Sequence, residues 1–162
     1  MAALHAPTPQ SPSLQAASLV DALTAVGARP FAIPTIRIAP PADPEALLRA
    51  VQNAGEYDWL IFTSVNGVEV FFAERARLRS DAHTRPIRGR IAAIGPATAE
   101  ALRAYGCNAD VVPDEYRGEA VAAAMQSRFG ASLRGATILL PRAAGAREAL
   151  PQMLRDAGAR VD

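Results

Sequence analysis

The sequence contains no lysine, and all seventeen of its basic residues are arginine. Sixteen acidic residues balance them to a formal net charge of +1, which gives no support for nucleic acid or an anionic membrane as the main partner. In this alanine-rich chain, the absence of lysine is more typical of codon bias than of seventeen separate anion sites. Arginine does offer forked donors that suit carboxylates, so a polyacid ligand is compatible with the composition.

The chain has a single cysteine, Cys107, which excludes an internal disulfide and any cysteine-based metal cluster. No stretch approaches the roughly eighteen consecutive apolar residues that mark a membrane-spanning helix. The amino terminus lacks the layout of a signal peptide. We therefore expect a reducing, cytoplasmic compartment.

Several motifs of common enzymes are also missing. No Gly-x-Gly-x-x-Gly or Walker A sequence follows a predicted strand, so a dinucleotide or P-loop nucleotide is not indicated. His5 and His83 stand alone without metal-ligand spacing, and Ser64 lies outside any Gly-x-Ser-x-Gly motif. The sequence therefore predicts neither a metal site nor a serine nucleophile.

What is present is a globular chain of 162 residues, half of them hydrophobic, organised around one stretch. Trp59–Phe62 is a short, continuous apolar run, which predicts a strand buried on both faces. Thr63 and Ser64 end that run, and Asn66-Gly67 is predicted to turn the chain. A helix over Val68–Arg77 follows, because large apolar side chains recur there at helical spacing.

Before this unit, the sequence predicts a helix over Leu14–Gly27 and an edge or ribbon strand over Phe31–Ile38. Pro40-Pro41 suggests a lobe boundary. A helix is then expected with Asp43 as its N-cap and its end at Gly55. The tripeptide Gly-Ala-Arg after the first helix recurs at Gly158-Ala159-Arg160, which suggests a duplicated unit.

After this unit, strands and helices alternate with short connections, which predicts a mainly parallel α/β sheet with helices on both faces. The predicted elements are a polar loop over Ala76–Gly89, strands over Ile91–Ile94, Val111–Pro113 and Thr137–Leu140, and helices ending at Gly106, Phe129 and Gly158. We expect two domains, an incomplete first lobe over residues 1–40 and an α/β second lobe over residues 41–162.

Polar side chains follow the predicted strands, at the edge where open α/β sheets bind ligands. The candidate site residues are Thr63, Ser64, Asn66, Thr98 and Arg142. Such a set can bind and orient an anionic ligand, but it does not by itself supply a strong general base. Alternatively, the polar residues after Phe62 only cap the next helix.

Two segments, Asp58–Val68 and Ile91–Leu102, together with Val112-Pro113 and Leu139–Arg142 after them, resemble the uroporphyrinogen-III synthase family of tetrapyrrole biosynthesis. The resemblance extends over about Leu14–Asp162. It implies two α/β lobes joined by a two-stranded ribbon, with the active site in the cleft between them. The first lobe of the family is built from both ends of the chain, and the second lobe is inserted between them.

The resemblance also implies a reaction. The family takes linear hydroxymethylbilane, expels its hydroxyl group as water, inverts the last pyrrole ring and closes the macrocycle, as a hydro-lyase without a metal or organic cofactor. The resemblance places Thr63, Ser64, Asn66 and Thr98 at the cleft, and we add Arg142 on geometric grounds. The expected partner is thus a linear tetrapyrrole polycarboxylate, bound by a monomer, with no nucleic acid and no membrane.

The sequence departs from the family pattern at both ends. Residues 1–13 show no strand ending in Thr-Arg-Pro, and the chain stops at Asp162, where a return strand carrying a tyrosine is expected. We therefore expect a fragment with low activity or none. The alternative is a non-catalytic flavodoxin-like or receiver-like module that binds an anionic ligand or a protein, although the acidic cluster of a receiver is missing.

Overall fold

The computed structural model describes residues 14–33, 43–78 and 86–162. It divides into two units, Met1–Pro40 and Pro41–Asp162. Every strand of the described residues lies in the second unit, which also holds the buried core. Among the helices that the structure describes, none is long and apolar enough to cross a membrane.

The second unit is built on a four-stranded sheet in the order β2-β1-β3-β4, and all of its strand pairs are parallel. The strands are β1 (Trp59–Phe62), β2 (Arg90–Ala93), β3 (Thr137–Leu139) and β4 (Arg160–Val161). All four residues of the central strand β1 are buried, as a continuous apolar run predicts. The predicted parallel α/β sheet is therefore confirmed.

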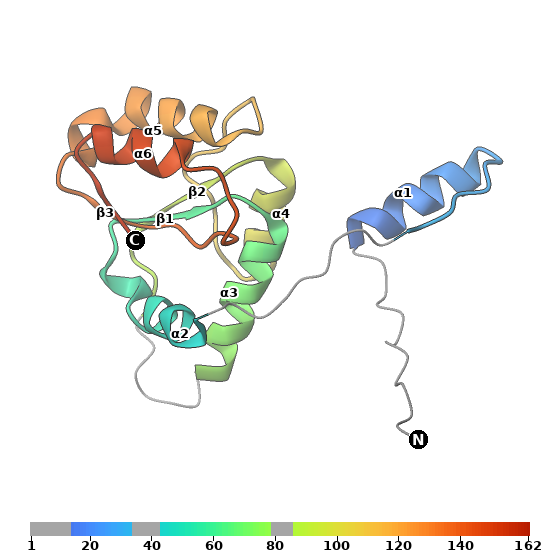
Figure 1. The fold of residues 1–162 in the computed structure, drawn as a ribbon, viewed down its shortest axis with the longest axis horizontal. Coiled ribbons are helices and arrows are strands. Elements are labelled where there is room, and N and C mark those ends of the chain that lie inside the picture. Colours follow the sequence, from blue (N-terminus) through green and yellow to red (C-terminus); the bar gives the residue numbers. More distant parts are fainter. Residues whose placement is uncertain (1–13, 34–42, 79–85) are drawn as a thin grey trace, which may run out of the picture. The chain divides into compact units, whose positions relative to one another are not determined.

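Helices cover both faces of this sheet (Figure 1). On one face lie α5 (Gly118–Leu133) and α6 (Ala149–Asp156), and on the other lie α2 (Pro44–Gln52), α3 (Val65–Leu78) and α4 (Pro96–Ala104). Successive residues of β1 point to opposite faces. Trp59 and Ile61 accordingly pack with α5 and α6, whereas Leu60 and Phe62 pack with the other layer.

The start of α2 is as predicted, but its end is not. The carboxylate of Asp43 accepts a hydrogen bond of 3.0 Å from the amide of Ala46, and Pro44 is the first helical residue. The prediction that Gly55 ends this helix is wrong, because α2 stops at Gln52. The chain tightens there into a 3₁₀ turn, η1 (Ala54–Glu56), which buries Ala54.

The predicted turn at Asn66-Gly67 is also wrong, since both residues lie in the first turn of α3. The reason is Ser64, whose side-chain oxygen accepts a hydrogen bond of 3.0 Å from the amide of Gly67 and so starts the helix early. At its other end α3 continues to Leu78, so the first residues of the predicted polar loop are helical. Residues 79–85 of that loop lie outside the described residues.

The short strand predicted over Val111–Pro113 is reduced to an isolated bridge between Val111 and Ala92. Val112 is exposed, and Pro113 has no amide to donate to a ladder. Downstream, α5 extends beyond Phe129, where the helix was predicted to end. Phe129 itself has non-helical dihedral angles within α5. The strand after it, β3, and the glycine cap at Gly106 follow the prediction.

The first unit contains α1 (Leu14–Ala25), and its predicted glycine cap at Gly27 is confirmed by the backbone hydrogen bonds there. Gly27 has a φ of 83°, and Gly158 after α6 has a φ of 91°. Residues 28–33 form no strand, and residues 34–38 of the predicted ribbon strand lie outside the described residues, as does the Pro40-Pro41 dipeptide.

Candidate active site

A cavity of about 270 Å³ opens at the carboxyl-terminal edge of the sheet. Three of its lining residues, Thr63, Ile94 and Leu140, come directly after β1, β2 and β3. The rest of the lining comes from Tyr116 and the start of α5, from the segment between β3 and α6, and from the first turn of α6. The cavity therefore lies at the edge where the sequence predicts a ligand.

The two residues after Phe62 have different surroundings. Thr63 is half-buried and lines the cavity, whereas Ser64 is exposed and accepts the amide of Gly67 as the cap of α3. A Cβ atom on Gly67 would lie 3.6 Å from the carbonyl oxygen of Pro141. The first turn of α3 thus runs close to the segment that follows β3.

The cavity brings together two of the five predicted site residues, Thr63 and Arg142. Ser64, just before α3, and Asn66, in its first turn, are both exposed and do not line the cavity. Thr98 is the third residue of α4 and only 3% exposed, and it packs inside the second unit rather than in the cavity wall.

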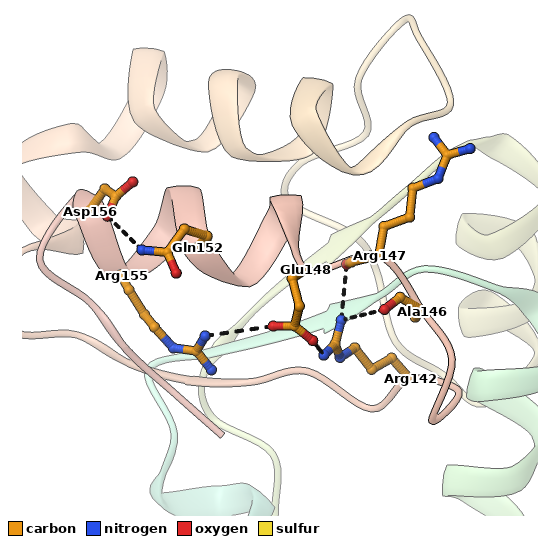
Figure 2. Close-up of polar contacts among 7 residues, drawn as sticks. All are labelled: Arg142, Ala146, Arg147, Glu148, Gln152, Arg155 and Asp156. Carbon is orange, nitrogen blue, oxygen red and sulfur yellow. Dashed lines mark hydrogen bonds and ion pairs between the residues drawn. The ribbon is translucent and has the colours of Figure 1, made fainter.

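Arg142 is held by the segment that follows it (Figure 2). Its Nη1 donates to the carbonyl oxygens of Ala146, at 3.3 Å, and Arg147, at 3.0 Å. Its Nη2 pairs with the carboxylate of Glu148, which also lies 3.8 Å from Nη1 of Arg155. With 24% of its side chain exposed, Arg142 both organises this segment and lines the cavity.

Apart from Thr63 and Arg142, the lining residues were not predicted as site residues from the sequence; among them are Tyr116, Arg117 and Arg147. The ring of Tyr116 packs against Gly95, where a Cβ atom would lie only 2.9 Å from the ring. The sequence around Gly95 predicts only the end of a strand, although glycine also marks places where another group approaches the backbone closely. The path that brings Tyr116 there depends on the tertiary fold.

The charged groups of the lining are mainly cationic. Arg117 forms an ion pair of 2.5 Å with Glu115, and Arg147 extends away from the Arg142–Glu148 pair (Figure 2). Glu119 is the one acidic residue among the lining residues that the structure describes. Forked guanidinium donors favour planar, bidentate acceptors, so the lining suits a ligand that carries carboxylates.

Size further limits what the cavity can hold. Ligand pockets usually measure about 300–1,000 Å³, and a cavity of about 270 Å³ lies just below that range. It suits one ring-sized part of a ligand rather than a large molecule as a whole.

The groups with shifted pKa values lie outside this lining. Burial raises the pKa of Tyr57, as does the hydrogen bond that its hydroxyl donates to Asp162, and burial raises the pKa of the Cys107 thiol. Within the described ranges, no group of three or more His, Cys, Asp or Glu residues could hold a metal ion.

Comparison with known proteins gives the family. The family model described as "Uroporphyrinogen-III synthase HemD" matches residues 17–162. The chain is 32% identical over 148 residues to a uroporphyrinogen-III synthase of Synechococcus elongatus, covering 91% of this chain and 54% of that protein. It is 30% identical over 151 residues to the porphyrin biosynthesis protein HemD of Ruminiclostridium josui, covering 93% of this chain and 29% of that protein.

Solved structures show the same fold. The crystal structure of wild-type uroporphyrinogen III synthase from Thermus thermophilus matches with a TM-score of 0.60 at 18% identity, over 92% of this chain and 56% of that chain. A mutant of the same enzyme gives a TM-score of 0.61 at 16% identity, over 91% and 56%. The chain thus spans about half the length of these synthases, and, since the family model covers most of its residues, it belongs to the uroporphyrinogen-III synthase family.

Proposed function

We propose that this chain acts in uroporphyrinogen-III synthesis, as a hydro-lyase that cyclises hydroxymethylbilane with loss of water and inversion of the last pyrrole ring. The observation that carries the proposal is the family match over residues 17–162. In this proposal residues 41–162 form the second lobe and supply one side of the site, and residues 1–40 belong to the first lobe.

The lining of the cavity supports a role in binding this substrate. Hydroxymethylbilane is a linear tetrapyrrole with many carboxylates, and Arg142 and Arg147 offer guanidinium donors in the same cavity that Thr63 lines. We assign Thr63 and Arg142 to direct contact with the substrate. Ser64 and Asn66 are exposed at the start of α3, and Thr98 is buried in the first turn of α4.

Positioning is the main contribution that such a site makes. The linear substrate closes spontaneously, so an enzyme that holds one ring in place can select the inverted product without a strong base. The hydroxyl group leaves with a proton as water, and the carbon that carried it bonds to the α-carbon of the last pyrrole that already bears the methylene bridge. That bridge bond then breaks and re-forms at the other α-carbon of the same ring, which loses its proton, so that the macrocycle closes with this ring inverted. A cavity of about 270 Å³ would hold one substituted ring and its carboxylate arms.

Incubation of the chain with hydroxymethylbilane tests the proposal. We expect only a small fraction of type III isomer above the spontaneous type I background, because the activity expected from the sequence is low, and a still smaller fraction for Arg142→Gln. Arg103→Gln is a matched control, because Arg103 pairs with Glu100 on the exposed surface of α4. Formation of type I isomer alone, together with no binding of a carboxylated pyrrole, would contradict the proposal.

A further inference from the structure

Glu148 is placed unusually for a carboxylate that precedes a helix. It occupies the N-cap position of α6, but its side chain makes no capping hydrogen bond to that helix. The carboxylate turns instead to two arginines, with one oxygen on Arg142 and the other 3.8 Å from Arg155 (Figure 2). The carboxylate of Glu148 is thus paired with the Arg142 guanidinium, which lines the cavity.

The Arg142–Glu148 pair is weak enough to exchange. The Glu148 side chain is 66% exposed, whereas that of Arg142 is 24% exposed, so water competes for the carboxylate side of the pair. By contrast, two backbone carbonyls, those of Ala146 and Arg147, hold Nη1 of Arg142. The guanidinium can therefore keep its place while the partner of Nη2 changes.

Arg155 provides a second position for the displaced carboxylate. It lies in the last turn of α6, and its Nη1 already faces the second oxygen of Glu148. A small rotation of the Glu148 side chain would shorten that contact as the contact to Arg142 is lost. The negative charge would then remain paired in both arrangements.

We infer that Glu148 is an internal competitor for Arg142. Without ligand, its carboxylate occupies the guanidinium; when a carboxylate arm of the substrate enters the cavity, that arm takes Arg142 and Glu148 moves to Arg155. The inference rests on the proposed function, because it assigns the exchanged carboxylate to a pyrrole of the substrate. It also gives Glu148 a part in specificity, since a ligand without a carboxylate cannot replace it.

Titration of the full chain with porphobilinogen, a single pyrrole that carries an acetate and a propionate arm, tests this inference by calorimetry. We expect Glu148→Gln to bind about two- to five-fold more tightly, the loss of a competitor worth about 0.4–1 kcal/mol. Arg155→Gln should bind about two-fold more weakly, because the displaced carboxylate loses its partner. In the double variant the effect of Arg155→Gln should disappear.

Glu119→Gln is the matched control, because Glu119 also lines the cavity and its neutralisation removes the same charge. An equal gain in affinity for Glu119→Gln would overturn the inference in favour of a general field effect. Weaker or unchanged binding by Glu148→Gln would overturn it too, since Glu148 would then position Arg142 or do nothing. Binding that Arg142→Gln leaves unaltered, or no binding by the wild type, would instead show that the proposed site itself is wrong.

Discussion

Two helices of this chain end in the same way but have very different surroundings. After α1, the amide of Gly27 donates to the carbonyl of Thr24 and that of Ala28 to the carbonyl of Leu23. After α6, Gly158 and Ala159 repeat this pattern with Arg155 and Leu154. Both glycines have positive φ, and both are followed by Ala-Arg. The local sequence therefore specifies the same cap twice.

The apolar faces of the two helices differ. On α6, Leu150 and Leu154 are 4% and 1% exposed and belong to the core beneath α5. In the first unit, by contrast, the apolar residues Leu19, Leu23 and Val26 of α1 and its cap are 60%, 39% and 79% exposed. Helix and cap formation are thus local properties, whereas the stability of a helix depends on the surface that covers its apolar face.

The largest expected difference between the two helices comes from truncating matched leucines. Leu154→Ala should lower the free energy of unfolding by about 2–5 kcal/mol, because it leaves a cavity in the core. Leu23→Ala should change it by less than about 0.5 kcal/mol, since its side chain lies outside that core. Urea unfolding followed by the fluorescence of Trp59 measures both. A comparable loss for both variants would mean that α1 is part of the cooperative unit.

The two glycine caps give a smaller contrast. Gly158→Ala should cost roughly 1–2 kcal/mol, because an alanine at this φ is strained and its Cβ would also lie 3.3 Å from Cγ of Arg134. Gly27→Ala carries the same local strain, but no atom lies within 4 Å of its Cβ position. We expect it to reduce helical circular dichroism slightly without shifting the unfolding midpoint. A shift equal to that of Gly158→Ala would contradict the comparison.

The segment after the second cap is also tied to the sheet by Tyr57, and this contact should depend on pH. The Tyr57 hydroxyl donates to the Asp162 carboxylate at 3.0 Å, and burial, followed by this hydrogen bond, raises the Tyr57 pKa above 10. A raised folded-state pKa means that the contribution is intact below about pH 10 and is lost as the pH rises through the folded-state value.

Tyr57→Phe tests this contact with the smallest expected effect. It should cost less than about 1 kcal/mol at pH 7, where one hydrogen bond is lost. As the pH rises above about 10, the wild type should lose stability relative to the variant, so their unfolding midpoints should converge. Midpoints that fall in parallel over this range would show that Tyr57 titrates alike in both states.

Much of the fold followed from local patterns. The apolar run Trp59–Phe62 gave β1 with its bounds, and Asp43-Pro44 gave the start of α2, because both depend on neighbouring residues only. The errors occurred where local signals compete. Asn66-Gly67 has the composition of a turn, but the cap at Ser64 incorporates it into α3. The sequence at Val111–Pro113 is typical of a strand, but it pairs only once.

The site was less predictable than the fold. The carboxyl ends of parallel strands meet at one edge, and this rule was sufficient to propose Thr63 and Arg142. The same rule could not predict Tyr116 or Arg147, because both lie in loops between elements of secondary structure. The path of such a loop depends on contacts distant in sequence, such as that of Gly95 with the Tyr116 ring. Nor could the rule show that Thr98, one turn from the same edge, is buried.

In our interpretation, residues 41–162 carry their own core, with the candidate site at its edge, while α1 is stabilised only locally. Hydrogen exchange on the whole chain tests it most directly, because the slowest amides report on global unfolding. We predict slow exchange in Leu60–Phe62 and Ile91–Ala93, and fast exchange throughout α1, whose twelve residues form only a marginal helix when uncovered. Equal protection of α1 and the two strands would contradict the account.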